Sequence, residues 1–437
     1  MITMSNKTHR LFTLALSALV TLILASCGAA TPATTQPSTA ASASATAASA
    51  AAASDAGAAS AAASASSAAS PDAPVAIPSV AATPEETTAA AEETATALET
   101  ATAETVAGQD ATPAIVAAAN AFLATLSDSQ RESALFDWTD TEQKQRWSNL
   151  PEGLYERAGL KWGDLSEQQQ TAWLAVMQAT LSEEGYNRVI AEWNADDALA
   201  AAQGSGGSGG GPGGQLLFGK QYYYIALIGT PSEAEPWQWQ WGGHHVTVNA
   251  TIAGSDVALT PSFIGCQPCE YTDATGATVR PLGDINDEAF ALVNALDAVQ
   301  QQAAVLGSSS IDLVLGPGQD DKTIQAEGLP ASQMTADQQG ALLQLISHYT
   351  GLINDEDAAA RIAEIESTLD QTYFAWYGAT AKGSASYFRI TGPTIVIEYS
   401  PQGGGGSGVG LGGAATLEHI HGIYRDPTND YGAKYTQ

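Results

Sequence analysis

The sequence predicts an α+β fold for residues 113–437, with a helical part first and then a mostly antiparallel sheet with inserted helices. Two observations support this. Apolar residues recur at helical spacing in the first third of this region. Later segments alternate between apolar and polar residues with the period of two that is typical of strands. No change of composition divides 113–437 convincingly, so we expect one domain.

The first helix is expected to begin at Thr112-Pro113, because proline suits the first turn of a helix. Ser127 with Gln130, and Ser166 with Gln169, have the spacing of a capping box. Helical spacing recurs in further segments, namely 186–193, 286–306, 335–348 and 355–369. Glycine-rich runs at 204–214 and 403–413 are interpreted as flexible loops.

Strands are predicted where β-branched and aromatic residues gather or alternate. The expected strands are 221–228, 237–241, 244–252, 373–377, 386–390, 394–399 and 416–424. Trp237, Trp239 and Trp241 share one face of their strand because side chains two residues apart point the same way. We expect this face to pack in the core; the alternative is stacking on a sugar or an aromatic ligand.

Residues 1–27 resemble the signal peptide of an exported lipoprotein. Lys7 and Arg10 precede an apolar run, 11–24, that is too short to span a bilayer comfortably. Leu24-Ala25-Ser26-Cys27-Gly28 then matches the lipobox. We expect acylated Cys27 to anchor the protein in the membrane, facing outside the cytoplasm. The alternative is an ordinary secretory signal with a chance cysteine.

Residues 28–112 consist almost wholly of Ala, Ser, Thr, Pro and Glu, without lysine, arginine or aromatic residues. Such a segment buries too little apolar surface to offset its ordering entropy. The sequence therefore predicts a disordered tether between the anchor and the folded domain.

The chain is strongly acidic, with 16 Lys+Arg against 47 Asp+Glu and a formal net charge of -31. Removal of residues 1–26 would take away two basic residues and no acidic one. This charge repels phosphate backbones, so nucleic-acid binding is not expected.

Four of the six histidines form two tight clusters, His244-His245 and His419-Ile420-His421. On a strand, His419 and His421 point to the same face, and the face of Thr247 and Asn249 favours His245 over His244. Three converging imidazoles would suit Zn, Cu, Fe or Mn, with His244 or Glu398 as alternative ligands. Glu418 points away from its histidine neighbours and is the weaker carboxylate. The alternative is that these histidines are packed or form a polar strand face.

Cys266-Gln267-Pro268-Cys269 is a C-x-x-C motif whose flanking residues indicate a loop. Outside the cytoplasm such a pair is usually oxidised, and we expect a local structural disulfide. Thioredoxin-like redox chemistry would need the cysteines at a helix N-terminus. Metal ligation and redox exchange remain the alternatives.

Two arginines are candidates for binding an anionic ligand. Arg425 is followed by Asp426 and Asp430, so a salt bridge is the simpler interpretation. Arg389 lies on the strand next to that of Glu398 and is an expected cross-strand partner for it.

Several ordered motifs resemble the family known as domain of unknown function 3500 (DUF3500) over roughly residues 115–435. They are Pro236-Trp237, 243–249, 260–265, 387–390, Gly392-Pro393, 397–399, 419–421, 425–427 and 429–432. The resemblance implies no established activity. The two cysteines and the 403–413 run depart from the family pattern, which argues against a role in a shared active site.

The sequence contains no Walker or H-E-x-x-H motif and no G-x-S-x-G nucleophile elbow, since the string Gly206-Gly207-Ser208-Gly209-Gly210 falls inside the glycine-rich run 204–214 that is interpreted as a loop. We therefore expect an extracytoplasmic lipoprotein that is a His-ligated, metal-dependent protein, either hydrolytic or redox-active. The alternative is a non-catalytic lipoprotein that binds a small-molecule or cell-envelope ligand, or that has a structural role at the cell surface.

Overall fold

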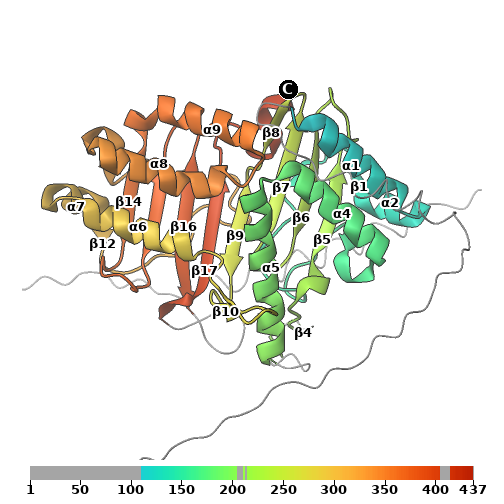
Figure 1. Cartoon of the computed structure of the whole chain (residues 1–437), viewed down its shortest axis with the longest axis horizontal. Coiled ribbons are helices and arrows are strands. Elements are labelled where there is room, and N and C mark those ends of the chain that lie inside the picture. The colour runs from blue at the N-terminus through green and yellow to red at the C-terminus, as the bar shows by residue number, and fades with distance from the viewer. Residues whose placement is uncertain (1–109, 204–209, 212–213, 404–413, 437) are drawn as a thin grey trace, which may run out of the picture. The chain divides into compact units, whose positions relative to one another are not determined.

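Helices and a large sheet make up the folded part of the chain (Figure 1). The computed structural model describes residues 110–203, 210–211, 214–403 and 414–436. The predicted signal peptide with Cys27, the tether up to residue 109 and most of both glycine-rich runs lie outside these residues. The main helices are α1 (Thr112–Ala124), α2 (Asp128–Ala134), α3 (Thr141–Lys144), α4 (Glu167–Thr180), α5 (Glu183–Gln203), α6 (Gly283–Ala295), α7 (Ala298–Ala304), α8 (Ala336–Thr350) and α9 (Asp355–Ser367).

Both predicted capping boxes are confirmed, at the starts of α2 and α4. The prediction of one helix over 286–306 is wrong, because the chain breaks between α6 and α7. Asp297 accepts hydrogen bonds from the backbone N–H groups of Val299 and Gln300 and so begins a new helix. No helix among the described residues is long and apolar enough to cross a membrane.

The strands form one large, mostly antiparallel sheet in the order β1-β5-β6-β7-β9-β17-β16-β15-β14-β12. Only the short edge strands β1 and β12 pair in parallel with their neighbours. The bounds are β1 (Leu135–Phe136), β5 (Tyr224–Ile228), β6 (Trp237–Gly242), β7 (Thr247–Ala253), β9 (Ser262–Cys266), β12 (Val305–Gly307), β14 (Tyr373–Tyr377), β15 (Tyr387–Thr391), β16 (Val396–Gly403) and β17 (Ala415–Arg425). The predicted α+β class is confirmed, but β9, at the centre of the sheet, was not predicted.

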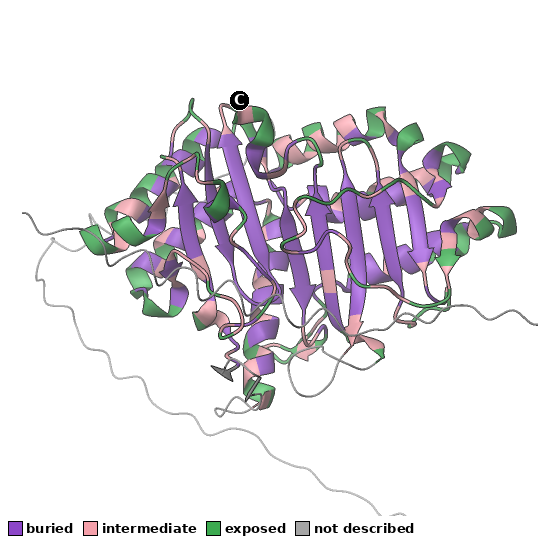
Figure 2. Ribbon diagram, turned by 180° about the vertical axis from the view of Figure 1, so that it is seen from behind, coloured by how far each residue is buried: buried purple, intermediate pink, exposed green. Residues whose placement is uncertain are grey.

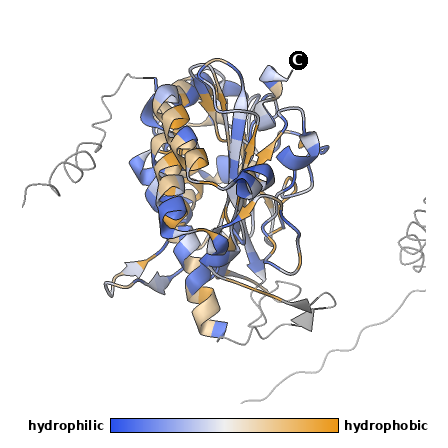
Figure 3. Cartoon of the chain, turned by 90° about the vertical axis from the view of Figure 1, so that its right-hand side faces the viewer, coloured by the Kyte–Doolittle hydropathy of each residue, from blue (hydrophilic) through white to orange (hydrophobic). Residues whose placement is uncertain are grey.

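The two faces of the sheet are covered differently. Long helices pack on one face, seen edge-on in Figure 3, and this face carries the three tryptophans of β6, which are fully buried as predicted. Irregular segments cover the other face, yet its strands are also buried (Figure 2). This second face is polar: Asn249 accepts a hydrogen bond of 2.8 Å from Gln240, and Glu398 lies beneath the loop that contains Val314 and Leu315. The loop-covered face of the sheet therefore contains several buried polar groups.

The two halves of the chain repeat one order of elements. In each half, two helices lead into a short strand that pairs in parallel with a longer one. A second short strand, β2 (Leu160–Lys161) or β13 (Leu329–Pro330), then precedes a 3-10 turn, two helices and four main strands. The first half has additional elements, including α3 and the short strands β3 (Gly210–Gly211), β4 (Gly214–Gln215) and β8 (Asp256–Ala258). The pairs α1 and α6, α4 and α8, β5 and β14, and β9 and β17 occupy corresponding places. Figure 1 shows the two halves side by side, in green-cyan and in yellow-red.

Gly159 and Gly328 correspond to each other in this repeat. Their φ angles are +101° and +98°, and a Cβ atom would lie 2.1 Å from the Ile225 carbonyl oxygen or 2.3 Å from that of Phe374. Each glycine lets a short strand approach the backbone of its neighbour, where a side chain would collide.

We predict that Gly159→Ala and Gly328→Ala each lower the free energy of unfolding by about 3 kcal/mol, through positive-φ strain and the backbone clash together. Gly276→Ala is the matched control, because Gly276 has a φ of +88° but no atom within 4 Å of a Cβ. It should cost only about 1–2 kcal/mol. Urea unfolding measures the difference, and equal losses in all three variants would contradict the close approach.

Candidate metal centre

His244 and His245 lie in the tight turn between β6 and β7, not in a strand as predicted. The Gly243 N–H donates to the Val246 carbonyl at 2.9 Å and closes this hairpin. His245 has a φ of +71°, in the left-handed region that a non-glycine residue seldom adopts. Such strain costs of order 1–3 kcal/mol and persists only where its surroundings impose it. The left-handed backbone at His245 therefore gives its side chain a different direction from the one it would have in a regular strand.

His419 and His421 lie on β17, on the loop-covered face, as period-two alternation predicts. His421 is opposite Gly265 of β9. A Cβ atom at Gly265 would lie 2.8 Å from the Ile420 carbonyl oxygen and 3.0 Å from that of His245. The missing side chain at this position therefore lets the His245 turn approach β17.

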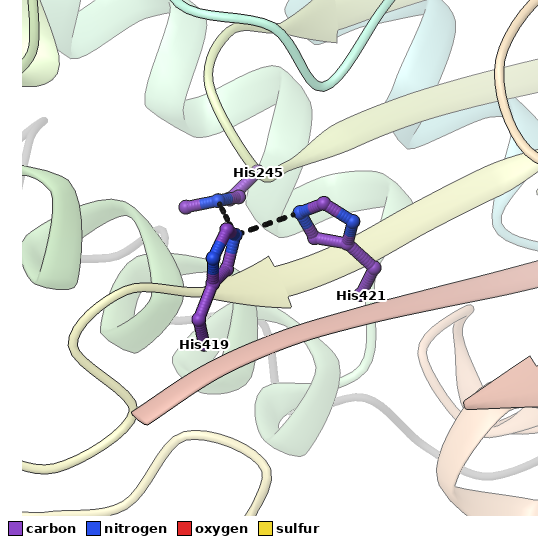
Figure 4. Close-up of side chains that lie close together, drawn as sticks. All are labelled: His245, His419 and His421. Atoms are coloured by element: carbon purple, nitrogen blue, oxygen red, sulfur yellow. Dashed lines mark hydrogen bonds between the residues drawn. The ribbon is translucent and has the colours of Figure 1, made fainter. Parts of the chain in front are cut away.

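The structure brings His245, His419 and His421 together (Figure 4). The Nε2 atom of His419 lies 2.9 Å from Nε2 of His245 and 2.9 Å from Nε2 of His421. Tetrahedral zinc with bonds of about 2.05 Å would need nitrogen atoms about 3.4 Å apart, so a small opening of the cluster would admit an ion. His244 and Glu398 do not join this group.

Burial controls the charge of the cluster. It is the main cause that lowers the pKa of His419 to about 4, and it holds the pKa of His245 and His421 well below the usual range. At neutral pH all three imidazoles are therefore uncharged, and each has one nitrogen lone pair. Hydrogen bonds among the three Nε2 atoms cannot satisfy all of them. In a neutral imidazole, Nε2 of His419 has either one N–H or one lone pair, so it can form one good hydrogen bond with one of its two neighbours at a time. A cation would engage all three.

Asn149 is a site residue that the sequence analysis missed. Its side-chain nitrogen, Nδ2, lies 3.3 Å from Nε2 of His421. Its backbone carbonyl oxygen accepts a hydrogen bond of 3.4 Å from the backbone N–H of His245. Rotation of the carboxamide by half a turn would present its oxygen to the same point. Asn149 comes from an irregular loop nearly 100 residues before the nearest site histidine, so no local pattern marks it.

His244 supports the turn and does not point to the cluster. Its Nδ1 atom lies 2.6 Å from Oδ1 of Asp196, whose other oxygen accepts from the Gly219 N–H at 2.9 Å. The Tyr223 hydroxyl donates to the His244 carbonyl oxygen. The His244 ring lies against that of His245, with centroids 3.6 Å apart. Asp196 and Tyr223 thereby fix the hairpin that positions His245.

Glu398 is buried elsewhere on the same face. Its carboxylate accepts hydrogen bonds from the backbone N–H groups of Val314 and Leu315, at 2.8 and 2.7 Å, and from the Tyr387 hydroxyl at 2.6 Å. These bonds satisfy the charge that made it a candidate ligand. Arg389 is opposite Glu398 in the sheet register, as predicted, but its ion pair is with Glu327.

Arg425 forms salt bridges, in line with the simpler interpretation. Its Nη1 atom lies 2.8 Å from Asp430 and 3.1 Å from Asp320. Its Nε donates to the Leu315 carbonyl at 2.9 Å. This network fastens the loop-covered face and leaves little of the guanidinium for a ligand.

Cys266 and Cys269 form a disulfide where β9 ends. The predicted loop begins only after Cys266, because that residue is the last of the strand. The Cys269 N–H donates to the Glu418 carbonyl at 3.1 Å, so the disulfide loop lies beside the residue that precedes His419. Glu418 itself is exposed, in keeping with its expected direction.

His348 belongs to a separate ion-pair network between helices. It is buried, and its Nε2 lies 2.8 Å from Glu288. Glu184 and Asp284 also approach it, but Arg188 binds both carboxylates, at 3.2 and 2.6 Å. The guanidinium already supplies the positive charge there, so a metal ion is not needed.

Two surface depressions lie at the opposite end of β7 from the histidines. One of about 1080 Å³ is lined by residues of 135–139 and 229–236, and one of about 240 Å³ by residues of 256–260 and 357–364. The chemically distinctive residues lie instead under the loop that contains Asn149. Neither of these two hollows is lined by His245, His419 or His421.

Over residues 108–433 the sequence matches the family described as protein of unknown function (DUF3500). The chain belongs to the DUF3500 family. The match covers the turn of His245 and the strand of His419 and His421, and it confirms the resemblance drawn from the motifs. No curated protein and no solved structure matches the chain.

We predict that the metal-free protein becomes less stable as pH falls below 6.5. Unfolded imidazoles take up protons near 6.5, whereas folded His419 resists until about 4, and His245 and His421 resist further. The unfolded state then binds more protons, and each imidazole adds up to about 1.4 kcal/mol per pH unit to the loss.

Urea unfolding at several pH values measures this dependence. The variant His419→Asn/His421→Asn should show a flatter profile, because two of the three buried imidazoles are gone. Equal slopes for the two proteins would contradict the burial of neutral histidines.

Proposed function

We propose that this chain is an extracytoplasmic, lipid-anchored metalloprotein whose metal ion is bound by His245, His419 and His421. The observation that carries the proposal is the convergence of three neutral imidazole Nε2 atoms, two of them 2.9 Å from the third. They come from two parts of the chain that are 174 residues apart. Such convergence in a buried site is typical of a metal centre.

The ligand set favours hydrolysis. Three imidazoles with a remaining open position suit a metal that lowers the pKa of a bound water and so supplies a nucleophile. Zinc fits this role, and copper, iron and manganese share the preference for imidazole to differing degrees. The residues of this chain hold the ligands in place: Asp196 and Tyr223 fix the His244-His245 turn, and Asn149 borders His421.

A non-catalytic binding function has less support. It relied on Arg425 and Arg389, and both have acidic partners within the fold. The tryptophans of β6 pack against helices; the Trp239 indole N–H, for example, donates to Thr180 of α4 at 3.1 Å. These side chains are therefore not available for a ligand.

The location outside the cytoplasm rests on two features. Residues 1–27 combine a basic start, a short apolar run and the lipobox that ends at Cys27. The disulfide between Cys266 and Cys269 supports the same conclusion, because disulfides persist mainly in oxidising compartments.

We predict that the full chain, purified without a chelator or a polyhistidine tag, contains close to one equivalent of a transition metal, measured by elemental analysis. His419→Ala/His421→Ala should reduce the content to background, because two of the three ligands are lost. Asp196→Asn should weaken metal affinity less than the double substitution does, because Asp196 holds His244, which positions the turn of His245 and is not itself a ligand.

His348→Ala is the matched control, since it removes a buried histidine outside the cluster and should leave the metal content unchanged. A wild-type protein that stays metal-free after reconstitution with Zn, Cu, Fe and Mn would refute the metal site.

We also predict that Cys27→Ser abolishes incorporation of a labelled fatty acid and releases the protein from the membrane fraction. The Cys266→Ser/Cys269→Ser variant is the control and should still be labelled, because those sulfurs form the internal disulfide. Labelling that persists in Cys27→Ser would contradict the anchor.

A further inference from the structure

Arg157 is a cation without an acidic partner next to the candidate metal centre. Its Nη2 atom donates to the carbonyl oxygens of Ser148 and Leu150, at 2.7 and 2.5 Å. Its Nη1 atom is covered and has no hydrogen-bond partner. Within the described part of the chain, no carboxylate lies within 4.0 Å of this guanidinium, whereas Arg188, Arg389 and Arg425 all have acidic partners.

Glu152 is the carboxylate that acts on the pKa of Arg157, and it is already engaged. Glu152 accepts a hydrogen bond of 3.0 Å from Tyr224 and forms an ion pair of 3.5 Å with Lys161. Burial is therefore the main influence on Arg157 and lowers its pKa. Its desolvation has a cost that a bound anion would offset.

The position of Arg157 links it to the histidines. The two carbonyl groups that it holds are on either side of Asn149, the residue that contacts both His421 and the His245 backbone. One short segment, 148–150, therefore separates the arginine from the metal ligands.

We propose that Arg157 is the substrate-recognition residue of this site and that the substrate is an anion with paired oxygen atoms, a carboxylate or a phosphoryl group. A guanidinium binds such groups through two parallel N–H···O bonds, which are stronger than bonds to neutral carbonyl oxygens. The inference rests on the proposed function, because it places the reacting bond of this anion at the His245–His419–His421 centre.

Binding exchanges one set of acceptors for another. As segment 148–150 shifts, Arg157 releases the Ser148 and Leu150 carbonyls and takes the oxygen atoms of the anion. The same shift moves Asn149 away from His421 and opens that side of the cluster. Leu150 is among the few large apolar residues of the described chain that are exposed, so the outer side of this segment meets solvent.

The test is anion binding by the full chain, in metal-loaded and metal-free forms. Orthophosphate and acetate are the two probes, titrated calorimetrically at constant ionic strength. Arg157→Gln should weaken binding of the preferred probe by at least about ten-fold, which corresponds to the loss of one charge-assisted pair. Arg157→Lys should give an intermediate affinity, because lysine keeps the positive charge but lacks the two parallel N–H donors of the guanidinium.

Arg146→Gln is the matched control, since Arg146 lies on the same loop, is partly exposed and pairs with Glu142. Metal content and the urea midpoint are measured for each variant, so that collapse of segment 148–150 is recognised. Unchanged affinity in Arg157→Gln, an equal loss in Arg146→Gln, or no binding of either probe by the wild type would each overturn the inference.

The two proposals fail separately. Arg157-dependent anion binding in a protein that takes up no metal would refute the metal centre and retain the recognition residue. A stoichiometric metal content, together with an anion affinity that does not depend on Arg157, would support the metal centre and refute the role of Arg157. The probe that binds more tightly distinguishes a carboxylate from a phosphoryl substrate.

Discussion

The pairing of β9 with its two neighbours is the constraint on which the rest of the domain depends. On one side β9 matches β17 over five residues, from Ser262 to Cys266. On the other side it meets β7 at a single register pair, Thr247 with Phe263. Beyond that pair the two strands diverge, and the His245 turn occupies the space that opens beside Gly265. The candidate centre therefore depends on the short pairing between β7 and β9, because a longer ladder of hydrogen bonds between these strands would leave no room for the His245 turn.

Much of the architecture could be predicted because the signals are local. Capping boxes fixed the starts of α2 and α4, and alternation placed the β6 tryptophans on the helix-covered face. The same alternation put His419 and His421 on one face. The pairing of these two with His245 followed from chemistry, since nearly all histidines of the domain fell in two clusters.

The features that the sequence did not predict all depend on contacts between residues far apart in the chain. The strand β9 is short, follows Thr260-Pro261 and ends in a cysteine, so its sequence resembles a loop; only its place between two longer strands makes it extended. His244 and His245 were assigned to a strand because nothing local reveals a left-handed residue at 245. Asn149 and Arg157 belong to an irregular loop whose position is set by the sheet beneath it. The repeat leaves a trace in the sequence, because capping boxes begin the corresponding helices α2 and α7, and also α4 and α8.

The two halves of the repeat contribute different elements to the candidate centre. The first half supplies the turn with His244 and His245; the corresponding turn of the second half, closed by the same bond from Gly392 to Ile395, has Pro393 and Thr394. The second half supplies the long strand β17, where the first half has only short β9. The two halves therefore contribute to one centre from non-equivalent positions, a turn from the first half and a strand from the second.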